Sequence, residues 1–320
     1  MEHIFVVNPV SGKADASLHL VPQIIEQAKK CGVSYRVEIT QSHRHAVDLA
    51  YEYARAAEQV RIYACGGDGT LNEVLEGVLS SGNSKAEVAS VPCGSGNDYV
   101  RNFGKLHDFL NLQEQIKGTA IPVDLMRTSK GISAAICSVG IDAKVAYNIP
   151  KYRRIPFCGG SMAYNLSIAE NLCRPIGQLL RVEIDDKVFE DEFLIATVCN
   201  GSYYGGGFRA APSADLQDGI LDVILVRKMS RLRIAGVLSK YKEGRHIDQD
   251  GMVVPDLKNV MLYFRAQEVH IAPVNRTSVI INVDGECEPA SRLDAIVMPK
   301  AANFVLPNIV WENWKRTRNV

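Results

Sequence analysis

The sequence lacks long hydrophobic runs and any excess of one charge. No apolar segment of the 320-residue chain approaches the roughly 18 residues that can span a bilayer. The opening stretch MEHIFVVNP has no basic region and no long apolar core, so we expect a strand there and no signal peptide. Acidic and basic residues balance at 36 each, and this balance gives no indication of a nucleic-acid partner. The composition is that of a soluble globular protein.

The cysteine pattern gives no indication of a disulfide framework or a zinc site. None of the eight cysteines forms a CxxC pair or a zinc-type spacing, and several lie inside apolar runs such as IYACGG and IATVCN. Buried thiols in a reducing cytoplasm are the simplest interpretation. We therefore expect a cytoplasmic protein.

Several nucleotide and hydrolase motifs are also missing. The chain has no GxxxxGK[ST] motif, which excludes a P-loop enzyme. No GxGxxG opens the first predicted helix with an acid about 20 residues later, which argues against a standard dinucleotide dehydrogenase. HExxH and GxSxG are absent as well. A catalytic or nucleotide-binding site, if present, must therefore be formed by motifs other than these.

The first 120 residues alternate between β-rich runs and helical periodicity. This alternation predicts a parallel sheet with helical crossovers. After about Asp124 short β-rich runs dominate, interrupted by helical stretches at 161–173 and 231–244, which predicts an antiparallel sandwich or barrel. The predicted strands of the first part are residues 4–7, 35–39, 61–65 and 87–92.

We therefore predict two domains, an α/β domain over residues 1–123 and a β-rich domain over 124–300, with a cleft between them. Residues 301–320 are expected to pack back on the first domain. The closing sequence WENWKRTRNV is predicted to be a frayed polar tail.

The stretch YACGGDGTLNEVLEGV places an acid among three glycines between a strand and a helix. The glycines permit positive φ and a close approach of a ligand to the backbone. A helix that begins near Thr70 or Leu71 would point its amide groups at a phosphate. Asp68 fits such a site if a divalent cation lies between its carboxylate and the phosphate. A tight turn closed by a capping box to Glu73 is the structural alternative.

Two other glycine-containing loops follow predicted strands, NPVSG at 8–12 and PCGSGND at 92–98. Because the carboxyl ends of parallel strands share one edge of a sheet, we expect these loops to meet the GGDGT loop. A fourth loop, NGSYYGGGF, follows a strand of the second half.

Two acidic segments of the second half could carry chemistry. In VDGE, Asp284 and Glu286 would share one face of an extended segment and could hold a metal ion or accept a proton. A hairpin turn at Asp-Gly explains the same residues at least as well. In APSADLQDGILDV, Asp218 could bind a hard cation or simply form a turn, and the turn is favoured by chemistry alone.

Taken together, the motifs of this chain resemble those of the diacylglycerol kinase catalytic-domain family, and they occur in the same order as in that family. They are NPVSG, Thr40, GGDGTLNE, GSGNDYVRN, VDL, SVGIDA, the AP-A-L-DG-LDV pattern and VDGE. The soluble bacterial lipid kinases, relatives of sphingosine and ceramide kinases, are especially similar. The likeness covers residues 4–306. It implies an α/β domain like those of NAD kinase and 6-phosphofructokinase, followed by a β-sandwich. It also implies transfer of the ATP γ-phosphate to a lipid hydroxyl with Mg²⁺.

The resemblance also implies roles for individual residues. Asp68 would help to place the catalytic Mg²⁺, and Asp284 and Glu286 would lie at the reaction centre, with Glu286 favoured as the proton acceptor. Asp218, with the backbone carbonyls of Asp215 and Ile220, would bind a second Mg²⁺. Asp98 and Asp124 would join a water network around that ion. The residues implied to contact ATP are Asn8, Pro9, Val10, Ser11, Gly12, Thr40, Gly66, Gly67, Asp68, Gly69, Thr70, Leu71, Asn72 and Ser95, the last replacing the family's usual Thr.

The acceptor is expected to be a membrane lipid, with diacylglycerol as the default, and the resemblance allows a homodimer. KYRRIPFCGGSMAYNL, residues 151–166, mixes basic and aromatic residues as an interfacial segment does, at the inner face of the membrane. A solvated loop before a packed helix accounts for it equally well. An NAD kinase, a kinase for a soluble polyol, and a non-catalytic nucleotide- or lipid-binding protein remain alternatives.

Overall fold

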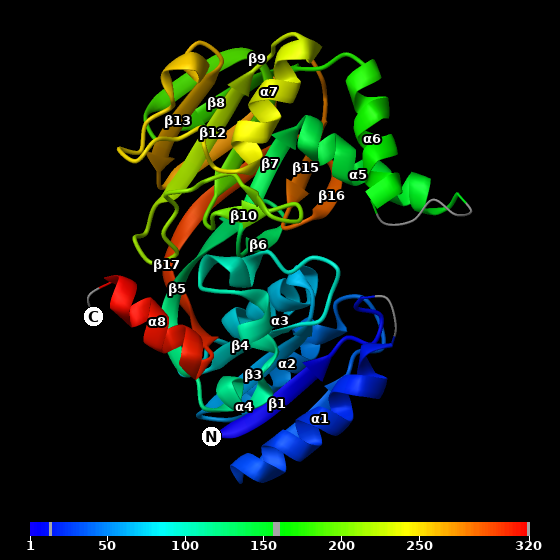
Figure 1. Cartoon of the computed structure of the whole chain (residues 1–320), viewed down its shortest axis with the longest axis vertical. Coiled ribbons are helices and arrows are strands. Elements are labelled where there is room, and N and C mark those ends of the chain that lie inside the picture. The colour runs from blue at the N-terminus through cyan, green and yellow to red at the C-terminus, as the bar shows by residue number, and fades with distance from the viewer. Residues whose placement is uncertain (13–14, 156–160, 319–320) are drawn as a thin grey trace. The chain divides into compact units, whose positions relative to one another are not determined.

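A computed structural model describes residues 1–12, 15–155 and 161–318. Contacts divide the chain into two compact units (Figure 1). Unit 1 comprises Met1–Leu125 and Pro299–Val320, and unit 2 comprises Met126–Met298. Unit 1 is therefore built from two separate pieces of sequence.

Unit 1 contains a parallel sheet with the strand order β17-β4-β3-β1-β2. The strand β17, Leu293–Leu306, contributes only its end to this sheet, where Asn303 and Phe304 align with Glu87 and Val88. The predicted parallel sheet is confirmed, with β17 as an additional strand. The other four strands are β1 (Glu2–Val7), β2 (Tyr35–Ile39), β3 (Val60–Gly66) and β4 (Glu87–Pro92).

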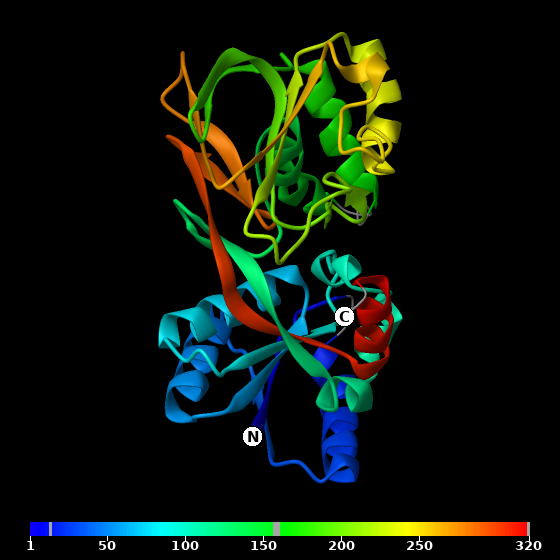
Figure 2. The same cartoon turned by 90° about the vertical axis from the view of Figure 1, so that its left-hand side faces the viewer.

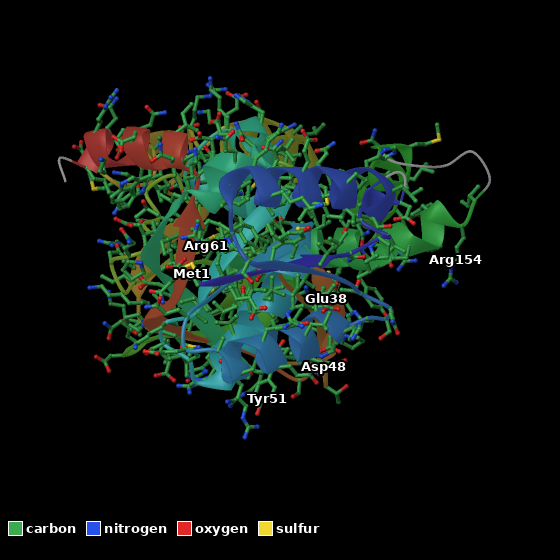
Figure 3. The ribbon with its side chains drawn as sticks, turned by 90° about the horizontal axis from the view of Figure 1, so that it is seen from below. Met1, Glu38, Asp48, Tyr51, Arg61 and Arg154 are labelled. Atoms are coloured by element: carbon green, nitrogen blue, oxygen red, sulfur yellow. The ribbon has the colours of Figure 1, made fainter. Side chains whose placement is uncertain are left out.

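Helices cover both faces of this sheet. Figure 3 shows α1 and α2 on opposite sides of β1. On the α1 side, apolar side chains of α1 and α4 pack against strand residues such as Phe5, Tyr63 and Val91. The burial of this apolar area is the main stabilising force in the layer. The helices of unit 1 are α1 (Ala16–Cys31), α2 (His45–Ala56), α3 (Asp68–Ser81), α4 (Leu112–Ile116) and α8 (Asn308–Arg318), with 3₁₀ turns at Tyr99–Asn102 and Leu106–Leu110.

The C-terminal residues differ from the prediction. The expected frayed tail is wrong, because Asn308–Arg318 forms α8 (Figure 2). Val310 of this helix is buried and lies beside Gly104. The segment is strongly polar overall, as a frayed tail would be, although its apolar residues Val310, Trp311 and Trp314 fall on one face of the helix.

Unit 2 is an antiparallel β-sandwich, as predicted. Its strands follow the order β16-β15-β7-β9-β8-β14-β17, and β12 pairs with both β9 and β13. The long β9 pairs with β8 along its first half and with β7 and β12 along its second half. The main strands are β7 (Ile136–Gly140), β8 (Gln178–Ile184), β9 (Lys187–Cys199), β12 (Leu221–Arg227), β13 (Met261–Ala266), β14 (Glu268–Pro273), β15 (Val279–Val283) and β16 (Glu286–Ala290).

Short strands and helices complete unit 2. Most of β5 (Thr119–Thr128) belongs to unit 1, but its last residues, from Met126 on, pair with β6 (Gly131–Ser133) in unit 2. Tyr203–Tyr204 pairs with Phe208–Arg209 as β10 and β11. The predicted helices are α6 (Ser161–Cys173) and α7 (Arg231–Lys242), and a 3₁₀ turn at Pro255–Leu257 lies between α7 and β13. The sequence reading missed α5, Ile141–Arg153, which packs beside α6 (Figure 1).

Within the described ranges, each helix is too short or too polar to cross a membrane.

Candidate active site

Three glycine-containing loops of unit 1 meet at the carboxyl ends of β1, β3 and β4. The Asn8 backbone N–H donates to the Cys65 carbonyl at 3.0 Å, and Asn8 Nδ2 donates to Thr70 Oγ1 at 3.0 Å. Gly94 N donates to the Gly66 carbonyl at 3.1 Å. The predicted convergence of NPVSG, GGDGT and GSGND is therefore confirmed.

The carboxylate of Asp68 ties two of these loops together. Its Oδ2 accepts a hydrogen bond from the backbone N–H of Asp98 at 2.7 Å, and its Oδ1 accepts one from Tyr99 at 3.1 Å. The Asp68 N–H in turn donates to the Gly96 carbonyl at 2.9 Å. Hydrogen bonds to an ionised carboxylate are among the stronger ones in proteins. Asp68 therefore fixes the GSGND loop against the start of α3.

Helix α3 begins earlier than predicted, at Asp68 rather than near Thr70. Its N-cap is Gly67, and no described side chain caps this end of the helix. The capping-box alternative is wrong, because Glu73 accepts a hydrogen bond from the backbone N–H of Arg44 instead. An N-terminus without a side-chain cap leaves its positive dipole end open to an anion, although the first amide, that of Asp68, already donates to Gly96.

Gly66 and Gly67 of GGDGT serve close packing rather than positive φ, whereas a Cβ on Gly69 would meet open space. The expectation of positive φ is wrong for Gly66, Gly67 and Gly69. A Cβ on Gly67 would lie 2.8 Å from the Gly96 carbonyl oxygen, and a Cβ on Gly94 would lie 2.4 Å from the Gly67 Cα. Only glycine lets two backbone segments approach this closely. The GSGND motif is recognisable in the sequence, but no packing role for Gly94 and Gly96 is predicted from it, although two closely spaced glycines in a loop indicate a close approach of backbone segments.

The other predicted ATP-contacting residues border the same edge of the sheet. Val10 N donates to Asn8 Oδ1 at 3.2 Å and Ser11 N donates to the Asn8 carbonyl at 3.2 Å, so the loop is a turn organised by Asn8. Thr40 N donates to the Val7 carbonyl at 2.9 Å, directly after β2. The side chain of Ser95 is exposed. Pro9, Gly12, Leu71 and Asn72 lie in the same loop and helix segments.

Two cysteines lie under these loops. Cys65 is fully buried, and Cys93 is partly buried. Burial raises the pKa of each thiol, which keeps it protonated and weakly nucleophilic at neutral pH. The expected burial is confirmed for Cys65, whereas Cys93 is half-buried and Cys173 is exposed. Cys158 lies outside the described residues.

In unit 2, the segment VDGE forms a turn, not one extended strand. Asp284 (φ 48°) and Gly285 (φ 95°) connect β15 to β16, so the expectation that Asp284 and Glu286 share the face of one extended segment is wrong. The hairpin alternative is the one observed. Positive φ at both central residues matches the turns that two-residue hairpins prefer.

The two acids of this turn have different environments. The Asp284 carboxylate accepts hydrogen bonds from the backbone N–H groups of Ala134, Ala135 and Ile136 at 2.6, 3.0 and 2.8 Å. Burial nevertheless raises the pKa of Asp284, and the three amide donors only partly oppose this effect. Glu286 is exposed. Asp284 is thus fixed by three backbone amides, whereas the Glu286 side chain is exposed to solvent.

The residues expected around a second Mg²⁺ form a turn in which an arginine faces the carboxylate of Asp218. Asp218 forms an ion pair with the guanidinium of Arg265, and its Oδ1 accepts a hydrogen bond from Ile220 N at 3.0 Å. The Asp215 carbonyl accepts a hydrogen bond from Asp218 N at 3.5 Å. Arg265 therefore supplies a positive charge where the resemblance places the ion.

The nearby Asp222 is almost fully buried, and the Tyr263 hydroxyl donates to its carboxylate. Burial raises the pKa of Asp222 to about 6.

The last two predicted residues, Asp98 and Asp124, are buried in unit 1. Asp98 forms an ion pair with Arg101 Nε at 3.0 Å, and Asp124 Oδ1 accepts a hydrogen bond from Lys300 N at 2.7 Å. Across the described residues there is no group of three or more His, Cys, Asp or Glu side chains arranged to hold a metal ion.

Comparison with known proteins identifies the family. Residues 2–128 match the model of the diacylglycerol kinase catalytic domain. Residues 135–306, more than half of the chain, match the model of the YegS C-terminal NAD kinase beta sandwich-like domain. The chain belongs to the diacylglycerol kinase family of lipid kinases. It is therefore a phosphotransferase of the lipid kinase type, as the sequence motifs predicted.

Individual relatives are similar in sequence to this lipid kinase over most of its length. It is 26% identical over 283 residues to a diacylglycerol kinase of Bacillus subtilis, which covers 88% of each chain. It is 26% identical over 279 residues to a probable YegS-like lipid kinase of Shewanella frigidimarina, which covers 85% of each. The structure of a putative diacylglycerol kinase from Bacillus anthracis superposes with a TM-score of 0.72 at 18% identity, over 97% of each chain. That last likeness concerns the fold alone.

Proposed function

We propose that this lipid kinase transfers the γ-phosphate of ATP to the hydroxyl of a membrane lipid, with diacylglycerol as the first acceptor and phosphatidic acid as the product. The observation that carries the proposal is the meeting of three glycine-containing loops at the uncapped N-terminus of α3. Such a helix end binds phosphate through its amide groups and dipole. The diacylglycerol kinases among its relatives support the choice of acceptor.

In this proposal the triphosphate lies on the loops Asn8–Gly12 and Gly66–Asn72, with Thr40 and Ser95 at the border of the site. The close packing of Gly67 against Gly96 leaves backbone rather than side chains at the point of contact. Backbone amides that are fixed before the substrate arrives stabilise charge without reorganising. Positioning of this kind supplies most of the rate enhancement in phosphoryl transfer.

Asp68 is the residue that would help to hold Mg²⁺. Its carboxylate is fixed by two amide donors, and a carboxylate oxygen accepts more than one contact, so the anchoring is compatible with that task. A bound Mg²⁺ would offset the negative charge of the transferring phosphoryl group. We do not extend the proposal to the second ion, because Arg265 already neutralises Asp218.

For the proton of the lipid hydroxyl we propose Glu286 as the acceptor. An exposed carboxylate can reach an incoming hydroxyl, whereas the oxygens of Asp284 are already held by three backbone amides. Asp284 would fix the turn that carries Glu286. We propose further that the enzyme works at the cytoplasmic face of the membrane, where its lipid substrate resides.

The direct test is incubation of the purified protein with Mg²⁺, labelled ATP and a panel of lipids in mixed micelles, followed by chromatography of the products. The panel contains diacylglycerol, phosphatidylglycerol, a sphingoid base and a polyprenol, with NAD and glycerol as soluble controls. Label in phosphatidic acid is the expected result. Label only in the soluble controls would contradict the proposal.

The same assay tests Glu286. The change Glu286→Gln keeps the shape of the side chain but removes its basicity, so we expect turnover to fall by about 10²-fold or more. ATP binding, measured by calorimetry, should be unchanged. Glu288→Gln on the same strand is the matched control, and its turnover should equal that of the parent. Unchanged turnover in Glu286→Gln would eliminate this residue as the proton acceptor.

A further inference from the structure

A cavity of about 300 Å³ lies in unit 2, beside α5 and α6 and apart from the predicted site residues. Its lining comes from α5, from the end of α6 and the following loop to β8, and from the segment around β15. Figure 1 shows α5 and α6 side by side, with α5 next to β15 and β16. The volume is at the lower limit for small-molecule sites, which suits a headgroup rather than a whole lipid.

Three cationic side chains, Lys144, Arg174 and Arg276, line this cavity, and its lining contains no Asp or Glu. Neither Lys144 nor Arg276 forms an ion pair with any residue that the structure describes. Arg174 pairs with Glu170 at 2.5 Å, but Glu170 also pairs with Lys151 at 3.0 Å. The cluster therefore carries a surplus of positive charge.

A neutral donor adds to this cluster. Gln178 lines the cavity, its residue is 6% exposed, and its Nε2 has no hydrogen-bond partner among the described residues. A buried amide donor without a partner costs free energy unless a ligand or water satisfies it. Burial, together with the charges of Arg276 and Arg174, lowers the pKa of Lys144, which shows that the cations act on one another. A bound anion would accept a hydrogen bond from the Gln178 amide and would offset the repulsion among the three cations.

The rest of the lining favours an anion with an attached carbon skeleton. Ile141, Ile176 and Ile280 contribute apolar surface to the same cavity. Guanidinium groups bind phosphate oxygens through paired N–H donors. We propose that this cavity is a binding site for a phosphate ester, held by Lys144, Arg276 and Arg174 with Gln178 as an additional donor. The ester could be supplied by the headgroup of an anionic phospholipid or by a soluble phosphate metabolite.

The test is calorimetric titration of the purified full chain, without ATP, with four probes. Inorganic phosphate, glycerol 3-phosphate and dihexanoyl phosphatidic acid carry the proposed group, and dihexanoylglycerol is the neutral control. The variants are Lys144→Met and Arg276→Gln. Lys258→Met, at an exposed lysine of unit 2 outside the cavity, removes the same charge as a matched control.

Each cavity variant should weaken binding of phosphatidic acid or glycerol phosphate by at least about tenfold, the loss of one charge-assisted contact. Lys258→Met should bind as the parent does. Phosphatidic acid binding at least about tenfold tighter than glycerol phosphate would identify a lipid headgroup, and equal affinities would identify a soluble ester. Phosphates can also bind to unit 1, so binding to this cavity is measured as the difference in affinity between the parent and the cavity variants.

The proposal is overturned if neither ester binds, if the cavity variants bind as the parent does, or if Lys258→Met loses as much affinity as they do. Arg276 is exposed, so Arg276→Gln remains informative even if Lys144→Met fails to fold. No phosphoryl transfer is scored, so this result is independent of the kinase reaction proposed above.

Discussion

At the scale of single residues, His3 is a buried ionisable group with a simple consequence. It is 5% exposed, and its Nδ1 is hydrogen-bonded with the Tyr63 hydroxyl at 2.7 Å. Burial, followed by the charges of Arg61 and the N-terminus, lowers the pKa of His3 from 6.5 to about 4. The folded chain therefore holds a neutral imidazole in a pH range where the unfolded chain binds a proton.

We predict that His3 makes unit 1 sensitive to mild acid. A group whose pKa is depressed by folding contributes its full stability above pH 6.5 and loses it as the pH falls towards 4. Between about pH 7 and pH 5 the loss should be roughly 2 kcal/mol. Urea titrations at both values, followed by the fluorescence of Trp311 and Trp314, measure it, because both tryptophans lie in unit 1.

The matched variant is His3→Gln, which retains a polar side chain but cannot titrate. Its stability should change less than that of the parent over this pH range. An equal pH dependence of the two proteins would show that His3 is not the responsible group.

At the scale of elements, one buried side chain attaches α4 to the sheet. Arg61 of β3 is 5% exposed (labelled in Figure 3). Its Nη1 donates to the carbonyls of Gln115 and Ile116 at 2.9 Å, and its Nη2 donates to that of Gly118 at 3.0 Å. Its Nε forms an ion pair with Glu87 at 2.7 Å. The guanidinium thus satisfies carbonyls at the end of a five-residue helix that is too short to be stable alone.

We predict that Arg61→Lys destabilises unit 1 by about 2–3 kcal/mol, although the charge is conserved, because an ammonium cannot reach four acceptors in this geometry. The change should appear as a lower urea midpoint in tryptophan fluorescence. Arg36→Lys is the control, since Arg36 is exposed and pairs with Glu2 at the surface. Equal midpoints for the two variants would contradict the role given to Arg61.

At the scale of the whole molecule, unit 1 requires both ends of the chain. The last residues of β17 pair with β4, and Phe304, Val305 and Leu306 are fully buried. Tyr99 and Phe103, from the segment after the GSGND loop, pack against Phe304 with ring centroids 5.0 and 5.2 Å away. The position of the GSGND loop therefore depends on residues some 200 positions away in sequence.

A truncation pair tests this dependence. A chain that ends after Met298 should fail to fold unit 1, because it exposes one side of β4 and removes a buried aromatic cluster. A chain that ends after Leu306 keeps the strand and should retain folded unit 1 with lower stability. Amide hydrogen exchange of β1, β3 and β4 distinguishes the two. Full protection in the shorter chain would show that unit 1 is complete without its C-terminal piece.

Much of the fold could be predicted from local sequence. The alternation of periods marked the strands and helices of residues 1–92, and Asp185-Asp186 marked the β8–β9 hairpin, because these elements form from neighbouring residues. The helices α5 and α8 were missed. α5 has only a weak apolar face in its sequence, and α8 is a strongly polar segment with few apolar residues, so both depend on what packs against them in the folded chain.

The candidate site shows the same division. Sequence by itself determined the family and the loops that carry the motifs, because glycine, proline and acidic residues at fixed short spacings leave a local signal. Only the tertiary structure decided that Asp68 fixes the GSGND loop, that the glycines permit backbone contact, and that Lys144 and Arg276 share a cavity. Contacts between residues far apart in the sequence have no characteristic spacing, because only folding brings those residues within hydrogen-bonding or Coulombic range.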